Sequence, residues 1–503
     1  MPATAALALT IASLLRDPAY AHAHYGLAVY DLDRHRTIYS VAADRLYDPA
    51  STTKLLTTGM TLGALGPQFR FKTPVYRTGD IDAQGTLHGD LVLVASGDAN
   101  LSQRIGADGT LAFEDEDHSY DGSPRTKAVP GDPLAVLRDL ARQAYARGIR
   151  RVDGRVVVDA SLFPDAGPEN GTGVDVSPIV VNDNIVDVIV APGKHPGDAA
   201  AILSISPATP YASFVNKATT GAPRADSTLS MTDGDDGKGN RVVTVSGSVA
   251  STDPPTLYAY RVPSPPRFAE EAFTLALRDA GVAIADPPAD PASFDRSAYA
   301  PSYRSEDLVA EHVSPPIRED VRVTLKVSDN LHADLMPYVV GVYAGKTTGP
   351  GALQAGFDVE RAFLLGQHLD ITGAAQQDGA GTAAFTPSFM VHYLAALWNQ
   401  SWFGDIHRGL PILGVDGTLA TIATTSPAKG KVFAKTGTSG MDNYLSRGDL
   451  VDKGLAGYMT TRAGHHIAFC SYIGNAVYPH GVDGSEKAGQ FNGAVANAIY
   501  LHE

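Results

Sequence analysis

The sequence predicts a mixed α/β (α+β) protein in which both ends of the chain build one antiparallel sheet flanked by helices. A large, mostly β insertion lies between those ends. Apolar and polar residues alternate in strand-like runs near both ends of the chain. Between them, short β-like runs are broken by glycine and proline. We therefore expect one discontinuous domain from residues 1–75 and 310–503, and one or more insertion domains at residues 76–309.

In the N-terminal part of this domain, the sequence predicts a helix, a hairpin and a second helix. The apolar stretch from Met1 to Leu15 favours a packed first helix. Alternation over residues 25–32 and 36–42, on either side of a polar turn, predicts a β-hairpin. From Ser51 onward apolar residues recur at helical spacing, with no proline until Pro67. Ser51 is therefore expected in the first turn of a helix.

Further strands are expected in the C-terminal part and in the insertion. The C-terminal part predicts strands at residues 431–436, 454–460 and 465–473, followed by a helix from about residue 486 to 501. The clearest strand-like runs of the insertion are residues 89–94, 155–158, 186–190 and 241–245. The alternating runs at both ends of the chain suit a single sheet.

Composition excludes several classes of protein. The chain has 503 residues, 44% of them hydrophobic and 19% charged, as is ordinary for a globular protein. Its formal net charge of −15 makes nucleic acid an unexpected partner. No run of 18 apolar residues predicts a transmembrane span. One cysteine excludes an internal disulfide, and the 15 histidines form no His-Glu-x-x-His motif, so we expect no metal and no cofactor.

A Ser-x-x-Lys pattern on a helix places a hydroxyl and an amine one turn apart. The amine can then take the serine proton as the oxygen attacks an acyl carbon. The chain contains this pattern at Ser51–Lys54 and again at Ser426–Lys429. The second match holds Pro427 and is closed by Gly430, so we assign it to a surface turn. The first match lies at the predicted helix start and is the better candidate.

Two further motifs follow the first match in order. Ser328-Asp329-Asn330 precedes an apolar helical stretch, and alone it would indicate a helix N-cap. Lys435-Thr436-Gly437 ends a predicted strand, and alone it would indicate a strand end followed by a turn. Ordinary caps and turns explain neither the order of the three motifs nor their placement on a helix start, a loop and a strand. We therefore interpret them as one catalytic site.

With these three motifs the chain resembles the D-alanyl-D-alanine carboxypeptidase/endopeptidase family of low-molecular-mass class C penicillin-binding proteins. Other stretches also look like the family: Pro49–Lys54, Ser96–Asp98, Val157–Asp159, Asp378–Gly381, Gly414–Leu419 and Leu455–Tyr458. The resemblance implies a serine β-lactamase/DD-peptidase-like transpeptidase fold in which the large insertion is typical. Two features depart from the family: Ala380 stands where serine is frequent, and an acidic segment at about residues 105–129 is an addition.

The resemblance assigns catalytic roles to five residues. Ser51 is the expected nucleophile, which attacks the carbonyl of the penultimate D-alanine and forms an acyl-enzyme that water hydrolyses. Lys54 is the expected general base, and it needs burial and the nearby charge of Lys435 to lower its pKa. Ser328 is expected to pass a proton to the leaving nitrogen. Asn330 is expected to hold Lys54 and the substrate amide.

Four further residues are expected to bind substrate. Thr436, together with Lys435, would bind the terminal carboxylate, and Gly437 completes that motif. The backbone N–H of Thr438 and that of the nucleophile would form the oxyanion hole. Asp159 resembles the position that some relatives use to meet the free amine of a diaminopimelate side chain. An ordinary turn aspartate after a strand is an equally weighted interpretation of Asp159.

Three functions stay open at this point. The first is a serine D-Ala-D-Ala carboxypeptidase, which could also be a DD-endopeptidase. The second is a serine β-lactamase, which the chain length and the absence of a Leu-Asn dipeptide disfavour. The third is a catalytically weak penicillin-binding wall module, against which the intact Lys54 and Asn330 argue.

The resemblance also implies partners and a location. We expect peptidoglycan stem peptides as substrates and β-lactam antibiotics as covalent inhibitors. The expected location is the periplasm or the extracellular cell envelope. Residues 1–15 show neither a basic start nor an Ala-x-Ala-type cleavage site, so the sequence contains no clear signal peptide.

Overall fold

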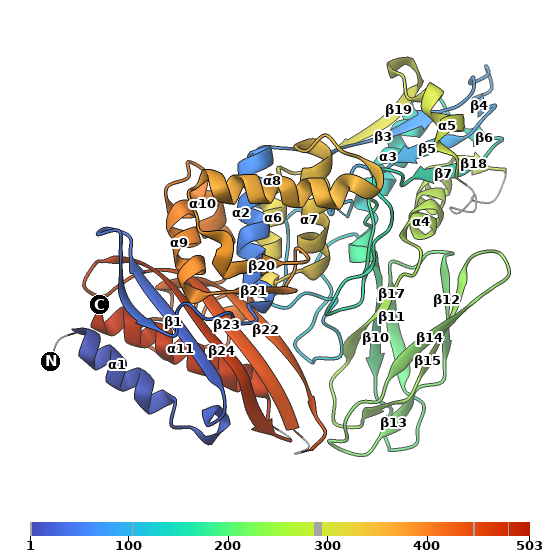
Figure 1. The fold of residues 1–503 in the computed structure, drawn as a ribbon. Coiled ribbons are helices and arrows are strands. Elements are labelled where there is room, and N and C mark those ends of the chain that lie inside the picture. The colour runs from blue at the N-terminus through green and yellow to red at the C-terminus, as the bar shows by residue number, and fades with distance from the viewer. Residues whose placement is uncertain (1–2, 103, 286–293, 446–447, 481) are drawn as a thin grey trace. The chain divides into compact units, whose positions relative to one another are not determined.

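The computed structural model describes residues 3–102, 104–285, 294–445, 448–480 and 482–503, which form two compact units (Figure 1). Unit 1 lies within residues 1–68, 321–347 and 352–503, and unit 2 within residues 69–320 and 348–351. The boundaries predicted after residues 75 and 309 fall inside strands β3 (Lys72–Arg77) and β19 (Leu308–Val313). These strands pair with each other, so their hydrogen bonds keep both in unit 2.

A five-stranded antiparallel sheet forms the centre of unit 1. Its order is β2 (Arg36–Val41), β1 (His24–Asp31), β24 (His466–Pro479), β23 (Gly448–Thr460) and β22 (Val432–Asn443). The predicted hairpin is present, and β1 pairs directly with the C-terminal strand β24. Strand β22 continues past the predicted end at Thr436 and remains paired with β23 up to Asn443. Both ends of the chain therefore contribute to one sheet, as the sequence predicts.

Two helices cover one face of this sheet: α1 (Ala3–Leu14) and α11 (Gly484–His502) (Figure 1). Apolar side chains from both helices and from alternating strand positions form one core, which includes Leu7, Val29, Leu455 and Val495. Because side chains alternate between the two faces of a strand, this core takes every second residue of β1 from Tyr25 to Val29. The predicted packed first helix is present.

The other face of the sheet carries a helical layer. It contains α2 (Lys54–Leu65), α6 (Ile317–Val327, from Val321 onward), α7 (Asn330–Tyr343), α8 (Ala352–Gly366), α9 (Pro387–Trp398) and α10 (Phe403–Gly409). The small hairpin of β20 (Ala374–Gln376) and β21 (Ala383–Phe385) lies beside it. The Tyr393 hydroxyl donates to the Leu55 carbonyl at 3.0 Å. A Cβ at Gly59 would lie 2.1 Å from that hydroxyl, so glycine lets α2 and α9 meet.

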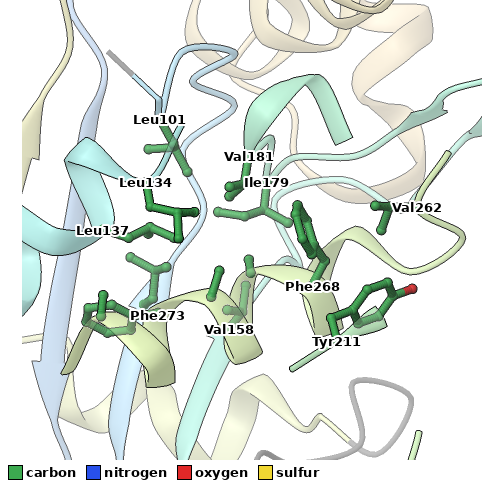
Figure 2. Close-up of a cluster of buried hydrophobic side chains, with 14 of the residues drawn as sticks. Leu101, Leu134, Leu137, Val158, Ile179, Val181, Tyr211, Val262, Phe268 and Phe273 are labelled. Carbon is green, nitrogen blue, oxygen red and sulfur yellow. The ribbon is translucent and has the colours of Figure 1, made fainter. Parts of the chain in front are cut away.

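Unit 2 has a four-stranded sheet in the order β19, β3, β5 (Leu91–Val94) and β7 (Val156–Asp159). Helices α3 (Ala135–Ala146) and α4 (Pro265–Asp279) pack on it. Figure 2 shows the apolar cluster between them, in which Leu137, Val158 and Phe273 point toward one another. The sequence analysis did not predict these two helices, although the insertion has strands at all four predicted places.

The remaining strands of unit 2 form smaller sheets. These are β18 (Ala283–Ile284) with β6 (Arg151–Val152) and β4 (Thr86–Leu87); β11 (Ala201–Ser206) with β10 (Ile185–Ala191) and β17 (Thr256–Arg261); β12 (Ala212–Asn216) with β15 (Arg241–Ser246) and β14 (Ser230–Asp235); β13 (Thr219–Gly221) with β16 (Ser248–Ala250); and β8 (Gly167–Pro168) with β9 (Asp175–Val176). A short helix, α5 (Arg296–Tyr299), precedes β19. Among the described helices, none has both the length and the apolar character needed to cross a bilayer.

Candidate active site

Ser51 and Lys54 lie where a 3₁₀ turn, Ala50–Thr53, runs into helix α2. The Lys54 Nζ donates a hydrogen bond to the Ser51 Oγ at 2.7 Å. Hydrogen bonds of the Thr52 hydroxyl hold this turn in place. It donates to the Pro49 carbonyl and lies next to the Tyr472 hydroxyl, each at 2.9 Å. The predicted helix-face pairing of hydroxyl and amine is therefore present, with the serine in a 3₁₀ turn instead of an α-helical one.

The loop between α6 and α7 carries the second motif. Asp329 is the N-cap of α7 and accepts from the His332 backbone N–H at 2.8 Å. Ser328 has a positive φ of 67°, an uncommon conformation for a residue other than glycine. With this turn the Asn330 Oδ1 lies 2.5 Å from the Lys54 Nζ, and the Ser328 Oγ lies 3.4 Å from it. The motif is thus a helix cap and part of the site at once.

Strand β22 supplies the third motif. The Lys435 Nζ donates to the Ser328 Oγ at 2.8 Å and to the Thr436 carbonyl at 2.9 Å. A Cβ at Gly437 would lie 2.2 Å from the Pro49 carbonyl oxygen, so only glycine lets β22 pass this close to the turn that holds Ser51. The structure therefore brings the three motifs together within unit 1, around Ser328.

Two buried amines dominate the electrostatics of this site. Lys54 and Lys435 are both 0% exposed. Burial, together with the positive charges of Lys54 and Lys453, holds the pKa of Lys435 well below its ordinary value. Both amines also donate to the same hydroxyl, that of Ser328. A positive charge on one amine opposes protonation of the other, so the pair favours a state with one neutral amine.

The glycine-rich stretch that follows β20 completes the surroundings of Lys54. The Ala380 carbonyl accepts from the Lys54 Nζ at 3.2 Å. The Gly379 carbonyl accepts from the Thr57 hydroxyl at 2.8 Å, and its N–H donates to the Asp334 carboxylate at 2.9 Å. Because Lys54 contacts the main chain of Ala380, this contact needs no serine at that position.

Two threonines follow Lys435 on the same strand, and each has a partner that the sequence analysis missed. The Thr436 and Thr418 hydroxyls lie 2.8 Å apart. The Thr438 hydroxyl accepts from the Lys453 Nζ at 2.6 Å. Thr418 belongs to the Gly414–Leu419 stretch that resembles the family, which was a usable signal. Lys453 falls just before the strand that was predicted to start at Gly454, so the pattern gave it no place in the sheet.

Asp159 lies in unit 2, at the end of β7, and is 2% exposed. Its carboxylate accepts from the Tyr303 hydroxyl at 2.8 Å and from the Ser161 hydroxyl at 2.5 Å. The Arg296 Nε lies 3.4 Å away. These contacts give Asp159 a structural role inside unit 2, and the predicted contact with a substrate amine stays a prediction.

The second Ser-x-x-Lys match lies in consecutive turns between α10 and β22. The Lys429 N–H donates to the Ser426 carbonyl at 3.1 Å, as in a single turn. No helix presents the two side chains on one face in this described segment, so the assignment of Ser426 and Lys429 to a turn holds.

The model that describes the D-Ala-D-Ala carboxypeptidase 3 (S13) family matches residues 7–496, which is nearly the whole chain. The chain belongs to this family. The match confirms the resemblance drawn from the three motifs. This S13 protein is an enzyme, a serine DD-peptidase of the D-Ala-D-Ala carboxypeptidase class, within a family of bacterial cell-wall peptidases.

Individual relatives agree with the family. A D-alanyl-D-alanine carboxypeptidase of Actinomadura sp. (strain R39) is 26% identical over 457 residues, which cover 87% of this chain and 77% of the relative. The D-alanyl-D-alanine carboxypeptidase DacB of Haemophilus influenzae is 23% identical over 468 residues, which cover 89% and 85%.

Solved structures show the same fold. The crystal structure of penicillin binding protein 4 (dacB) from Haemophilus influenzae has a TM-score of 0.74 at 21% identity, covering 98% of this chain and 99% of that chain. The same protein complexed with a β-lactam has a TM-score of 0.71 at 20% identity, covering 98% and 99%. This likeness confirms the predicted DD-peptidase-like fold of the S13 protein.

Proposed function

We propose that the chain removes the terminal D-alanine from peptidoglycan stem peptides through an acyl-enzyme on Ser51. The observation that supports this most directly is the 2.7 Å contact between the Lys54 Nζ and the Ser51 Oγ, inside a site that also holds Ser328, Asn330 and Lys435. A nucleophile within hydrogen-bond reach of a buried amine is the arrangement that activates a serine at neutral pH.

The acylation step follows from these contacts. Neutral Lys54 takes the proton of the Ser51 hydroxyl while the oxygen bonds to the carbonyl carbon of the penultimate D-alanine. The tetrahedral intermediate then loses the C–N bond. The Ser328 hydroxyl gives its proton to the departing nitrogen and recovers one from the adjacent Lys54 ammonium, because both lie in one hydrogen-bonded chain. Free D-alanine leaves, and the acyl group remains on Ser51 as an ester.

The same groups serve deacylation in reverse. A water molecule gives a proton to neutral Lys54 and attacks the ester carbonyl, after which the Ser51 oxygen leaves and is protonated. A positive charge on one amine opposes protonation of the other, and the proposed mechanism uses Lys54 as the neutral amine of the pair at the start of each step. Asn330 keeps the Lys54 amine in place through the 2.5 Å contact with its side-chain oxygen.

Substrate binding is proposed to use strand β22. Lys435 and Thr436 would meet the terminal carboxylate, and Gly437 keeps the strand close to the nucleophile. The N–H groups of Ser51 and Thr438 would form the oxyanion hole, and removal of one such donor typically costs about 10² to 10³ in rate. Asp159 is kept as the residue proposed to meet the side-chain amine of the stem peptide.

Two extensions belong to the same proposal. A β-lactam presents an acyl carbon to Ser51 in the manner of the peptide, so it should acylate the enzyme, and the β-lactam complex of the Haemophilus relative supports this. Cross-linked stems carry the same D-alanyl bond, so DD-endopeptidase activity is a second activity of this site. Free and cross-linked stem peptides are both components of the cell wall, which supports a periplasmic or extracellular location.

The direct test is the release of D-alanine from diacetyl-lysyl-D-alanyl-D-alanine. We expect release by the parent and none by Ser51→Ala, with Ser426→Ala as a matched control that retains the parent rate. Rapid penicillin hydrolysis without peptide cleavage would instead identify a β-lactamase. A stable penicillin adduct without D-alanine release would identify a wall-binding module.

A further inference from the structure

Another buried lysine lies behind the strand that carries Lys435. Lys453 stands on β23 directly opposite Thr438 of β22 in the antiparallel register. Its Nζ donates to the Thr438 hydroxyl at 2.6 Å and to the Ser485 hydroxyl, in the first turn of α11, at 2.9 Å. The side chain is only 9% exposed, and its stem passes over Gly489 of α11.

These contacts fix the direction of the Thr438 hydroxyl. An ammonium group has three donors and no acceptor, so the oxygen of Thr438 must accept from Lys453. The hydroxyl hydrogen of Thr438 is then available to donate to another acceptor. Thr438 is more exposed than its neighbours on β22 and is proposed to contribute its N–H to the oxyanion hole. A donor at this position suits an anionic group of a bound substrate.

Lys453 is not held by an ion pair. Among the described residues, no carboxylate lies within ion-pair distance of its Nζ, and both of its hydrogen-bond acceptors are hydroxyls. Asp483 and Glu486 at the start of α11 supply only longer-range negative charge. A buried, unpaired ammonium costs folding free energy, and such groups are concentrated at functional sites. The hydrogen bond from Lys453 to Thr438 connects this charge to the strand on which a substrate carboxylate is proposed to bind.

We infer that Lys453 sets the specificity of this enzyme for substrates with a free terminal carboxylate. It acts as a positioning residue: its ammonium orients the Thr438 hydroxyl toward that carboxylate and adds a positive charge behind β22. The inference rests on the proposed function, because it names the group of the stem peptide that this end of the site recognises. It adds a residue outside the three motifs to the recognition of substrate.

Charge state gives the inference a pH dependence. Burial, against the opposing effect of Asp483 and Glu486, lowers the pKa of Lys453 to about 8. The charge of Lys453 in turn helps to lower the pKa of Lys435 on the neighbouring strand. Because only the ammonium form carries the charge, preference for a carboxylate should weaken as the pH rises through about 8.

The test compares two substrates that differ at one group: diacetyl-lysyl-D-alanyl-D-alanine and the same peptide with a terminal carboxamide. Lys453→Met should raise KM for the carboxylate peptide by about 10- to 100-fold, the usual effect of one hydrogen bond to a charged group, with kcat little changed. The carboxamide peptide should be cleaved by the variant as it is by the parent. Lys453→Arg should recover much of the preference, and Lys431→Met, at an exposed lysine beside β22, should keep all of it.

Equal preference for the carboxylate in Lys453→Met and in the parent would overturn the inference while leaving the proposed function intact. If the parent released no D-alanine at all, the proposed function itself would fail, and the inference with it. Thr438→Val gives a second test that retains the lysine, and it should lose the same preference for the carboxylate. A Thr438→Val variant that kept this preference would show that the Thr438 hydroxyl does not take part in recognising the carboxylate.

Discussion

The two units bury charged groups in opposite ways. In unit 1, Lys54 and Lys435 lie side by side and share the Ser328 hydroxyl as an acceptor. In unit 2, the buried His118 lies between two carboxylates, with its Nε2 2.6 Å from Asp183 and its Nδ1 2.9 Å from Asp187. Like charges therefore meet in the first region, and opposite charges meet in the second.

The pKa values respond accordingly. Burial and neighbouring lysines depress the pKa of Lys435. Burial also acts to lower the pKa of His118, but the charge of Asp187 and the hydrogen bonds to both carboxylates raise it well above its ordinary value. A compensated buried charge stabilises the fold around it, whereas a cluster of like charges costs stability and leaves a proton acceptor available for chemistry. The comparison separates a structural network from the network that is proposed to be catalytic.

The largest effect is expected at Lys54. Lys54→Met should lower the rate of D-alanine release by about 10² to 10⁴, the usual contribution of a positioned base. Its effect on the free energy of unfolding should be small, because the removal of one of two buried like charges offsets the loss of the hydrogen bonds to Asn330 and Ala380. Steady-state rates and urea unfolding of the same preparation check both parts. A loss of stability of several kcal/mol would contradict this offset.

Breaking the opposite-charge network should mainly affect folding. Asp187→Asn removes one carboxylate from the buried His118 and should cost about 3–5 kcal/mol of unfolding free energy, as when one partner of a buried pair is lost. Asp153→Asn, at an exposed carboxylate beside His88, is the matched control and should change stability much less. Equal effects of the two variants on urea unfolding would show that the buried His118 network stabilises the fold no more than the exposed His88–Asp153 pair does.

Buried basic groups in the two units, His118 in unit 2 and Lys453 in unit 1, should also make the free energy of unfolding depend on pH with opposite signs. A raised folded-state pKa at His118 gives stability that is fully present below about pH 6.5 and is lost as the pH rises through the folded value. For Lys453, with a pKa of about 8, the unfolded chain binds more protons between about pH 8 and 10.4, so stability rises over that range.

Difference curves against single variants isolate these contributions. The destabilisation caused by His118→Gln should be largest in acid and shrink as the pH rises. The parent should gain stability relative to Lys453→Met above pH 8, by about 3 kcal/mol at most. Unfolding free energies measured across this range check both slopes, and parallel curves would contradict the assigned charge states.

The smallest effect is expected at the second Ser-x-x-Lys match. Ser426 and Lys429 lie in a turn, and the buried Ser426 hydroxyl has no hydrogen-bond partner among the described residues, so alanine at either position should change the unfolding free energy by no more than about 0.5 kcal/mol. D-alanine release should stay at the parent rate in both. A rate loss in Lys429→Ala would show that this turn contributes to the site.

Local sequence patterns predicted the elements that carry the three motifs well, because each of these elements leaves a short local signal. A hydroxyl and an amine one turn apart, a cap before a helix and a lysine on an alternating strand each leave a short signature. The order of these signatures along the chain then pointed to Ser51, Lys54, Ser328, Asn330 and Lys435 as one site. The structure shows that their side chains meet in unit 1.

Long-range contacts left no comparable signal. Strands β3 and β19 pair across more than two hundred residues, so alternation alone could not place the unit boundary outside them. Lys453 meets Ser485 only because α11 packs on β23. The helices α3 and α4 are different, because apolar residues such as Leu137, Leu140 and Ala144 recur at helical spacing on α3. Their omission was a failure to use a pattern that was present.

The most direct test of the account is to locate the covalent adduct formed with a penicillin. After brief exposure of the parent and Ser51→Ala, trypsin should release residues 46–54 as one peptide, which contains Ser51. The account predicts one penicilloyl group on this peptide in the parent and none in the variant. An adduct on another peptide, or one that persists in Ser51→Ala, would contradict the assignment of the nucleophile.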